Sequence, residues 1–130
     1  MRIQSVALII ALVVGTQPAF PQKKSPAPVG KPHPITFVEL GSVNCVPCRQ
    51  MQPVMKAIEK KYGDQIKVVF YDVWKPEQKK YAEQYGIRLI PTQVFLDAAG
   101  KEFFRHEGFY PEAEIDKLLQ KRGLKIRTGG

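Results

Sequence analysis

A chain of 130 residues with 44% hydrophobic residues has room for one globular domain of ordinary composition. Four basic residues and no acidic residue precede position 35, so the formal net charge of +8 leaves 16 basic and 12 acidic residues, or +4, for the rest. No basic run with interleaved aromatic residues occurs, and the composition therefore predicts no nucleic-acid partner.

Residues 1–20 predict an export signal or an N-terminal membrane anchor. Arg2 supplies the positive start, and the apolar stretch from Val6 to Gly15 is too short to span a bilayer comfortably. Ala19 suits the position before a cleavage site, but Gln17 is larger than the residue usual there, so both cleavage and retention stay open. We expect an exported protein in the periplasm or another extracytoplasmic compartment.

Residues 21–34 contain five prolines together with Lys, Ser and Gly. This composition cannot bury a core and predicts a flexible linker. Ile35 to Leu40 is apolar and extended in character, and it predicts the first strand. Gly41 and Ser42 are expected to break that strand.

The two cysteines of the chain, Cys45 and Cys48, lie at the start of a predicted helix that ends near Tyr62, before Gly63. Apolar residues recur there with helical spacing: Met51, Val54, Met55, Ile58 and Tyr62. Pro47 fits the first helical turn, so Cys45 lies near unpaired amides and the positive end of the helix dipole. Such a site can lower a thiol pKa from about 8.5 to roughly 3.5–7.5, which makes Cys45 the predicted nucleophile.

Cys48 is the predicted resolving thiol, one turn into the helix. It can attack a mixed disulfide between Cys45 and a substrate, releasing the reduced product without a metal or organic cofactor. His33 and His106 stand at no zinc-finger spacing, and Arg49 occupies the place where covalent haem attachment needs His. A soft-metal chaperone and a merely structural disulfide remain as alternatives at this point.

The middle of the chain predicts a strand followed by a helix. Ile66 to Val73 is apolar enough to favour a central, parallel strand. Pro76 is expected to open the helix and Gly86 to stop it, with Tyr81 and Tyr85 facing inward.

The C-terminal third predicts a hairpin and a last helix. Strands over Gln93 to Leu96 and Glu102 to Glu107 flank a turn at Asp97 to Gly100. Pro111 opens the final helix, and Gly123 follows it. The order of elements predicts the α/β class, with a parallel pair and an antiparallel hairpin in one sheet.

Two blocks of this sequence resemble the thioredoxin family. A strand, a Cys-x-x-Cys motif and a helix with proline at position 53 match Phe37 to Ile58, and the family's cis-proline block matches Gly86 to Thr92. The resemblance covers about Ile35 to Gly123 and implies a thioredoxin-like fold. Because the linker replaces the family's first strand and helix, we expect a mixed four-stranded sheet in the order 2-1-3-4, with helices on both faces.

The resemblance also implies roles for individual residues. It implies thiol-disulfide oxidoreductase activity and a cis Ile90-Pro91 bond beside the cysteines. Glu39, six residues before Cys45, takes the place of a buried family Asp that assists proton transfer to and from the second cysteine. From the sequence alone, the alternative for Glu39 is a strand carboxylate that faces solvent.

Two residues of the motif depart from the family pattern. Asn44 stands where the family usually has Trp, and Val46 stands where thioredoxins have Gly. The missing Trp puts the usual partner-docking surface in doubt. Together with Pro47, Ile90 and Pro91, these two residues form the predicted substrate-binding surface.

The resulting hypothesis is an exported, monomeric protein-disulfide reductase with a domain over residues 35–123 and a tail over residues 124–130. Its substrates would be exported proteins with disulfides, and a membrane-embedded thiol reductant would recharge it. A disulfide oxidase or isomerase is the first alternative. A non-catalytic module that binds peptides or a metal beside Pro91 is the second.

Overall fold

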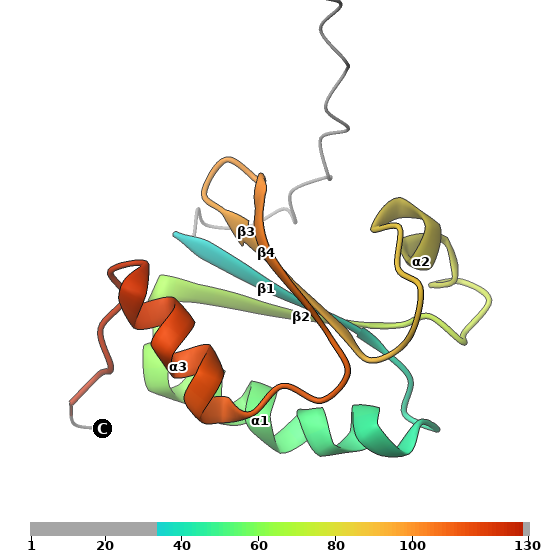
Figure 1. Cartoon of the computed structure of the whole chain (residues 1–130), viewed down its shortest axis with the longest axis horizontal. Helices are drawn as coiled ribbons and strands as arrows, with labels where there is room; N and C mark the ends of the chain where they lie inside the picture. Colours follow the sequence, from blue (N-terminus) through green and yellow to red (C-terminus); the bar gives the residue numbers. More distant parts are fainter. Residues whose placement is uncertain (1–33, 129–130) are drawn as a thin grey trace, which may run out of the picture.

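A computed structural model describes residues 34–128 (Figure 1). The predicted export segment, and the linker up to residue 33, lie outside the described residues. The strands are β1 (Ile35–Gly41), β2 (Ile66–Asp72), β3 (Thr92–Asp97) and β4 (Glu102–Glu107), and the helices are α1 (Val46–Tyr62), α2 (Lys80–Gln84) and α3 (Glu112–Lys121), with a 3-10 turn at Gly63–Gln65. Over residues 34–128, no helix is long and apolar enough to cross a membrane.

The four strands form one mixed sheet in the order β2-β1-β3-β4, as predicted. β1 runs parallel to β2 and antiparallel to β3, and β3 and β4 form a hairpin. The predicted parallel pairing of β2 is confirmed, but its predicted central position is wrong. β2 lies at the edge of the sheet, and its apolar character has another cause: Val68 and Phe70 pack into the core on one face, and Tyr71 packs into the core on the other.

Helices cover both faces of the sheet, with α1 and α3 on one face and α2 on the other (Figure 1). Alternate residues of β1 therefore enter two separate cores. Phe37 joins the core beneath α1 and α3, whereas Val38 and Leu40 join the core beneath α2. Every side chain of β1 is covered, which explains why most residues of β1 are apolar.

Two predicted boundaries were wrong. Gly41 does not break β1 but is its last residue. The helix expected from Pro76 is reduced to α2, because the residues before Lys80 form turns. In these turns the Gln78 side chain accepts a hydrogen bond from the Asp72 amide at 2.7 Å, which ties the segment to the end of β2.

A β-bulge interrupts the hairpin between β3 and β4. Phe95 pairs with Phe104 and Leu96 pairs with Glu102, which leaves Phe103 as the extra residue. Both Phe103 and Phe104 then pack against the core that contains Phe95. The bulge thus lets two consecutive aromatic residues contribute to one core.

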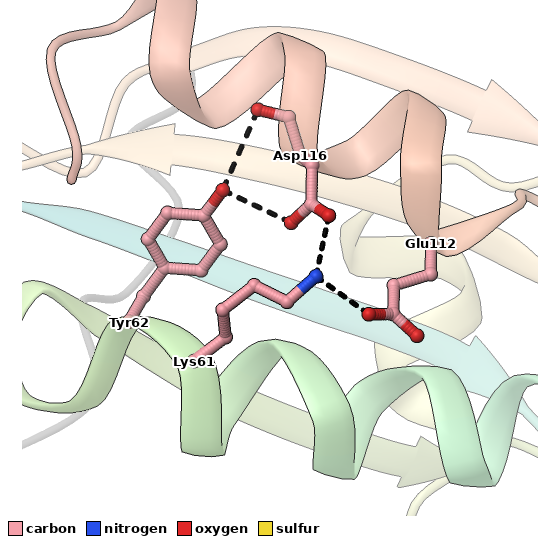
Figure 2. Close-up of polar contacts among 4 residues, drawn as sticks. All are labelled: Lys61, Tyr62, Glu112 and Asp116. Carbon is pink, nitrogen blue, oxygen red and sulfur yellow. Dashed lines mark hydrogen bonds and ion pairs between the residues drawn. The ribbon is translucent and has the colours of Figure 1, made fainter. Parts of the chain in front are cut away.

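Polar contacts join the C-terminal end of α1 to α3 (Figure 2). The Lys61 ammonium group pairs with the carboxylates of Glu112 and Asp116. The hydroxyl of Tyr62, a buried residue, donates to Asp116 Oδ1 at 3.0 Å. These contacts lie at the opposite end of α1 from the cysteines.

The segment after α3 packs against the domain rather than leaving it. Leu124 is buried in the core beneath α1 and α3. The Lys125 amide donates to Gln65 Oε1 at 2.9 Å, and the Arg127 amide donates to the Lys61 carbonyl at 2.9 Å. The packed unit therefore continues past the boundary expected at Gly123.

Candidate active site

Cys45 and Cys48 form a disulfide at the N-terminus of α1, with their Cα atoms 5.2 Å apart. Cys45 is the N-cap residue with an extended backbone, and its Sγ accepts a hydrogen bond from the Cys48 amide at 3.4 Å. Pro47 lies in the first turn, as predicted. Cys45 is 8% exposed and Cys48 is 0% exposed, so the first cysteine is the one that a partner can reach.

Backbone hydrogen bonds hold the turn that leads into the cysteines. The Ser42 carbonyl accepts from the Cys45 amide, and the Ser42 hydroxyl accepts from the Asn44 amide, both at 3.2 Å. The buried Asp72 carboxylate accepts from the Val43 amide through Oδ2 and from the Trp74 amide through Oδ1, each at 3.2 Å. Asp72 thereby joins the loop after β1 to the loop after β2.

Gly41 brings the end of β1 close to the second cysteine. A Cβ atom at this position would lie 3.2 Å from Cys48 Sγ and 3.4 Å from the ring of Phe70. Any larger side chain would have to displace the Cys48 sulfur or the aromatic ring. The sheet and α1 are therefore in direct contact at the disulfide.

Glu39 lies two residues before Gly41, so its side chain enters the same face of the sheet beneath α1. It is 0% exposed, which overturns the alternative of a solvent-facing carboxylate. Burial raises the pKa of Glu39 to about 8 from the usual 4.5, although a hydrogen bond from Gln93 acts to lower it. A carboxyl group with this pKa exchanges its proton near neutral pH.

The loop before β3 carries the predicted cis bond between Ile90 and Pro91. Leu40 pairs with Thr92, so β3 begins opposite the end of β1 and Pro91 lies at the same end of the sheet as the cysteines. The Pro91 carbonyl accepts a hydrogen bond from the Gly108 amide at 2.8 Å. Pro91 is buried and Ile90 is half-buried.

Exposed apolar side chains gather at this end of the sheet. These side chains lie just before or after the strand termini that meet there. They are Val43, Val46, Trp74, Leu89 and Phe109. Asn44 and Pro47 are also exposed. We define these seven residues together with Ile90 and Pro91 as the active-site rim.

Sequence reasoning missed six residues at this end of the sheet: Val43, Asp72, Trp74, Leu89, Gln93 and Phe109. Trp74 and Phe109 each stand just beyond a strand, beside turn residues, where a large apolar side chain is unexpected. Gln93 is polar in an otherwise apolar strand, which could have marked it as a buried partner. Asp72 carried no such signal, because the contact that ties it to the cysteine loop joins it to Val43, 29 residues away in the sequence.

Within residues 34–128, no group of three or more His, Cys, Asp or Glu side chains could hold a metal ion. His106 instead stacks on the ring of Tyr110 with centroids 4.3 Å apart.

Residues 23–123 match the family model described as a thioredoxin-like domain. Thioredoxin 1 of Synechococcus elongatus is 40% identical over 78 residues, which cover 59% of this chain and 69% of the relative. Thioredoxin of Bacillus subtilis is 32% identical over 77 residues, covering 59% of this chain and 71% of the relative.

Solved structures show the same fold. The thioredoxin NaTrxh of Nicotiana alata matches with a TM-score of 0.59 and 31% identity, covering 68% of this chain and 73% of that one. A mutant thioredoxin of Halobacterium salinarum matches with a TM-score of 0.61 at 20% identity, covering 75% of this chain and 80% of that chain.

Proposed function

This chain belongs to the thioredoxin-like family, and from that premise we propose that it reduces protein disulfides through a dithiol/disulfide cycle of Cys45 and Cys48. The observation that carries the proposal is the position of the pair at the N-terminus of α1, with Cys45 slightly exposed and Cys48 fully buried behind it. The helix terminus stabilises a Cys45 thiolate, because unpaired amides and the helix dipole favour negative charge there.

The reaction has two exchange steps. The Cys45 thiolate attacks one sulfur of the substrate disulfide, forms a mixed disulfide with it, and releases the other substrate sulfur as a thiolate. The Cys48 thiol then loses its proton and attacks Cys45 Sγ. This forms the disulfide seen in the structure and releases the second substrate thiolate.

We assign Glu39 as the proton acceptor for Cys48. The carboxylate lies on the face of β1 that contacts Cys48 through Gly41, and its pKa of about 8 leaves a usable ionised fraction at neutral pH. In the reverse reaction the protonated carboxyl returns the proton to the Cys48 thiolate.

The active-site rim would bind the polypeptide that carries the substrate disulfide. Its exposed apolar side chains suit an apolar segment of the partner, and the backbone at Ile90 suits an extended segment that pairs as a strand does. Since Asn44 replaces the usual Trp, docking would depend on Val46, Trp74 and Phe109 in its place.

The cellular setting belongs to the same proposal and is supported by the sequence of residues 1–20. An exported reductase works in an oxidising compartment, where soluble cytoplasmic reductants do not reach it. We therefore propose that a membrane-embedded thiol reductant recharges the cysteine pair, and that the substrates are other exported proteins with disulfides. The predicted linker would let the domain move between donor and substrate.

Trapping tests the two roles of the cysteines. Cys48→Ser should accumulate mixed disulfides with substrate proteins, because nothing resolves the first adduct. Cys45→Ser should accumulate none. Non-reducing electrophoresis of full-length tagged protein from its own cells, followed by reduction, measures both, and equal trapping by the two variants would refute the assignment.

The reduction potential of the pair tests the direction of electron flow. A value near −270 mV, of the order expected for a thioredoxin-type reductant, together with a mostly dithiol pool in cells supports a reductase. A value near −120 mV with a mostly disulfide pool would make the protein a donor of disulfides instead. Equilibration with glutathione gives the potential, and acid quenching with thiol labelling gives the pool.

A further inference from the structure

A pair of polar side chains, Glu39 and Gln93, crosses the core between β1 and β3. The two residues lie directly opposite each other in the antiparallel ladder, and both are 0% exposed. Gln93 Nε2 donates a hydrogen bond to Glu39 Oε1 at 3.3 Å. Phe37 and Phe95, the next pair along the same face, stack with centroids 4.7 Å apart, so the polar pair borders an aromatic core.

Other titratable groups on this face of the sheet have different partners. Cys48 lies above the end of β1 in α1, Asp72 lies at the end of β2, and His106 pairs with Gln93 from β4. The Asp72 carboxylate accepts two backbone amides, and the His106 ring stacks on Tyr110. The β2 residue that pairs with Glu39 is Phe70.

We propose that Gln93 is a positioning residue for the exchange reaction, which holds the Glu39 carboxyl group and partners it in both of its protonation states. The inference rests on the proposed reductase function. It assigns to Gln93 a role in the second step, where Cys48 loses its proton.

The carboxamide of Gln93 suits this role because it carries both a donor and an acceptor. An ionised carboxylate can only accept hydrogen bonds, and the Gln93 amino group donates to it. A protonated carboxyl also carries an O–H donor, and the Gln93 carbonyl oxygen can accept from it. Glu39 Oε2 and Gln93 Oε1 are both buried without a hydrogen-bond partner in residues 34–128. Both atoms are therefore available for the hydrogen bond of the protonated state.

The proton balance of the step is simple. The Glu39 carboxylate takes the proton from Cys48 Sγ and becomes a carboxylic acid, and the Cys48 thiolate attacks Cys45 Sγ of the mixed disulfide. The Cys45–Cys48 bond forms, the bond to the substrate sulfur breaks, and the substrate leaves as a thiolate. Gln93 transfers no proton or electron and acts only through Glu39.

The test replaces Gln93 with an apolar side chain of similar length, Gln93→Met, in the full chain. Met offers a hydrogen bond to neither form of Glu39, but the bond to the ionised form is charge-assisted and therefore the stronger of the two, so Glu39 should hold its proton to higher pH. Single-turnover reduction of a fluorescent disulfide-linked peptide should then show its pH midpoint raised by about one unit, and be about tenfold slower at pH 7. The first attack, measured in a Cys48→Ser background, should be unchanged.

Two controls separate this role from a loss of packing. Val94→Ala, at the next position of β3 but in the opposite core, should destabilise the fold without moving the pH midpoint. Adding Gln93→Met to Glu39→Gln should slow the reaction no further, because the group that Gln93 positions is already removed. A midpoint shift in Val94→Ala, or a further loss in the double variant, would overturn the proposal.

A measurement that needs no activity completes the test. Titration of the Glu39 carboxyl carbon by NMR in the disulfide form should give a higher midpoint in Gln93→Met than in the wild-type protein. Identical midpoints would overturn the role of Gln93 and leave the reductase function intact. A wild-type protein that reduces no peptide would instead refute the proposed function, and the positioning role with it.

Discussion

The Glu39 carboxyl combines burial with a neutral hydrogen-bond partner, and this makes the stability of the domain depend on pH. Its pKa of about 8 in the folded protein exceeds the usual 4.5, so the folded state binds more protons than the unfolded state between those values. The contribution is fully present below about pH 4.5 and is lost as the pH rises through about 8.

We therefore expect the free energy of unfolding of the disulfide form to fall relative to that of Glu39→Gln across this window, by up to about 1.4 kcal/mol per pH unit. Denaturant unfolding at several values between pH 5 and 9 measures it. Glu77→Gln, at an exposed carboxyl before α2, is the control and should run parallel to the wild-type curve. Parallel curves for Glu39→Gln as well would show that the carboxyl is ionised in the folded protein.

Residues at the active site differ in how far the sequence could predict them. Cys45 and Cys48 follow from a short local motif, whereas the cis bond before Pro91 and the buried place of Glu39 were implied only by the resemblance to the thioredoxin family. Gln93 could be marked only as a polar residue in an apolar strand. Its pairing with Glu39 could not be predicted, because that partner is set by the register between β1 and β3 rather than by spacing along the chain.

The two long helices on one face are joined by a polar cluster whose removal should destabilise the domain without affecting its chemistry. Asp116→Ala removes the side-chain acceptor of the buried Tyr62 hydroxyl and one carboxylate partner of Lys61. We expect a loss of about 1–3 kcal/mol, because the buried hydroxyl keeps only its longer contact, 3.5 Å, with the Asp116 backbone carbonyl. Lys117→Ala breaks only an exposed pair with Glu114 and should leave the free energy of unfolding nearly unchanged.

Denaturant unfolding of Asp116→Ala and Lys117→Ala gives the two free energies, and disulfide reduction by the folded fraction gives the activity. The cluster lies at the far end of α1, which at 17 residues is about 25 Å long, so activity per folded molecule should not change. Equal stability of the two variants would mean that the cluster contributes no more than a surface ion pair.

The helices and strands were predicted correctly where the residues that define them lie within or beside the element. α1 begins beside Pro47 and ends before Gly63, as expected from the sequence. α2 was predicted too long, because the segment after Pro76 is fixed by the contact between Gln78 and β2. The apolar run of β2 favoured a central strand, whereas the sheet order implied by the family resemblance already placed β2 at the edge. The apolarity misled because it reports cover by helices as well as by neighbouring strands.

For the molecule as a whole, the packed unit should extend beyond α3. Removing residues 124–130 would delete the buried Leu124 and the hydrogen bonds that Lys125 and Arg127 make to the domain. We expect that truncation to lower the free energy of unfolding by at least about 2 kcal/mol. Lys125→Ala, which keeps the backbone amide that donates to Gln65 and alters only an exposed side chain, should match the full-length protein in denaturant unfolding. A truncated chain with the same midpoint would place the domain boundary at Gly123.

Asp72 fixes the spacing between two loops of the active-site rim. One carboxylate holds the amides of Val43 and Trp74, so the loops that present these side chains beside the disulfide keep a fixed separation. When a partner docks across both loops, the loops lose little backbone freedom, so more of the contact energy remains as binding affinity. On the proposed function, substrate recognition would be selective for shape: a polypeptide that fits this spacing would bind at a small entropic cost, and one that does not fit would have to break the hydrogen bonds of Asp72.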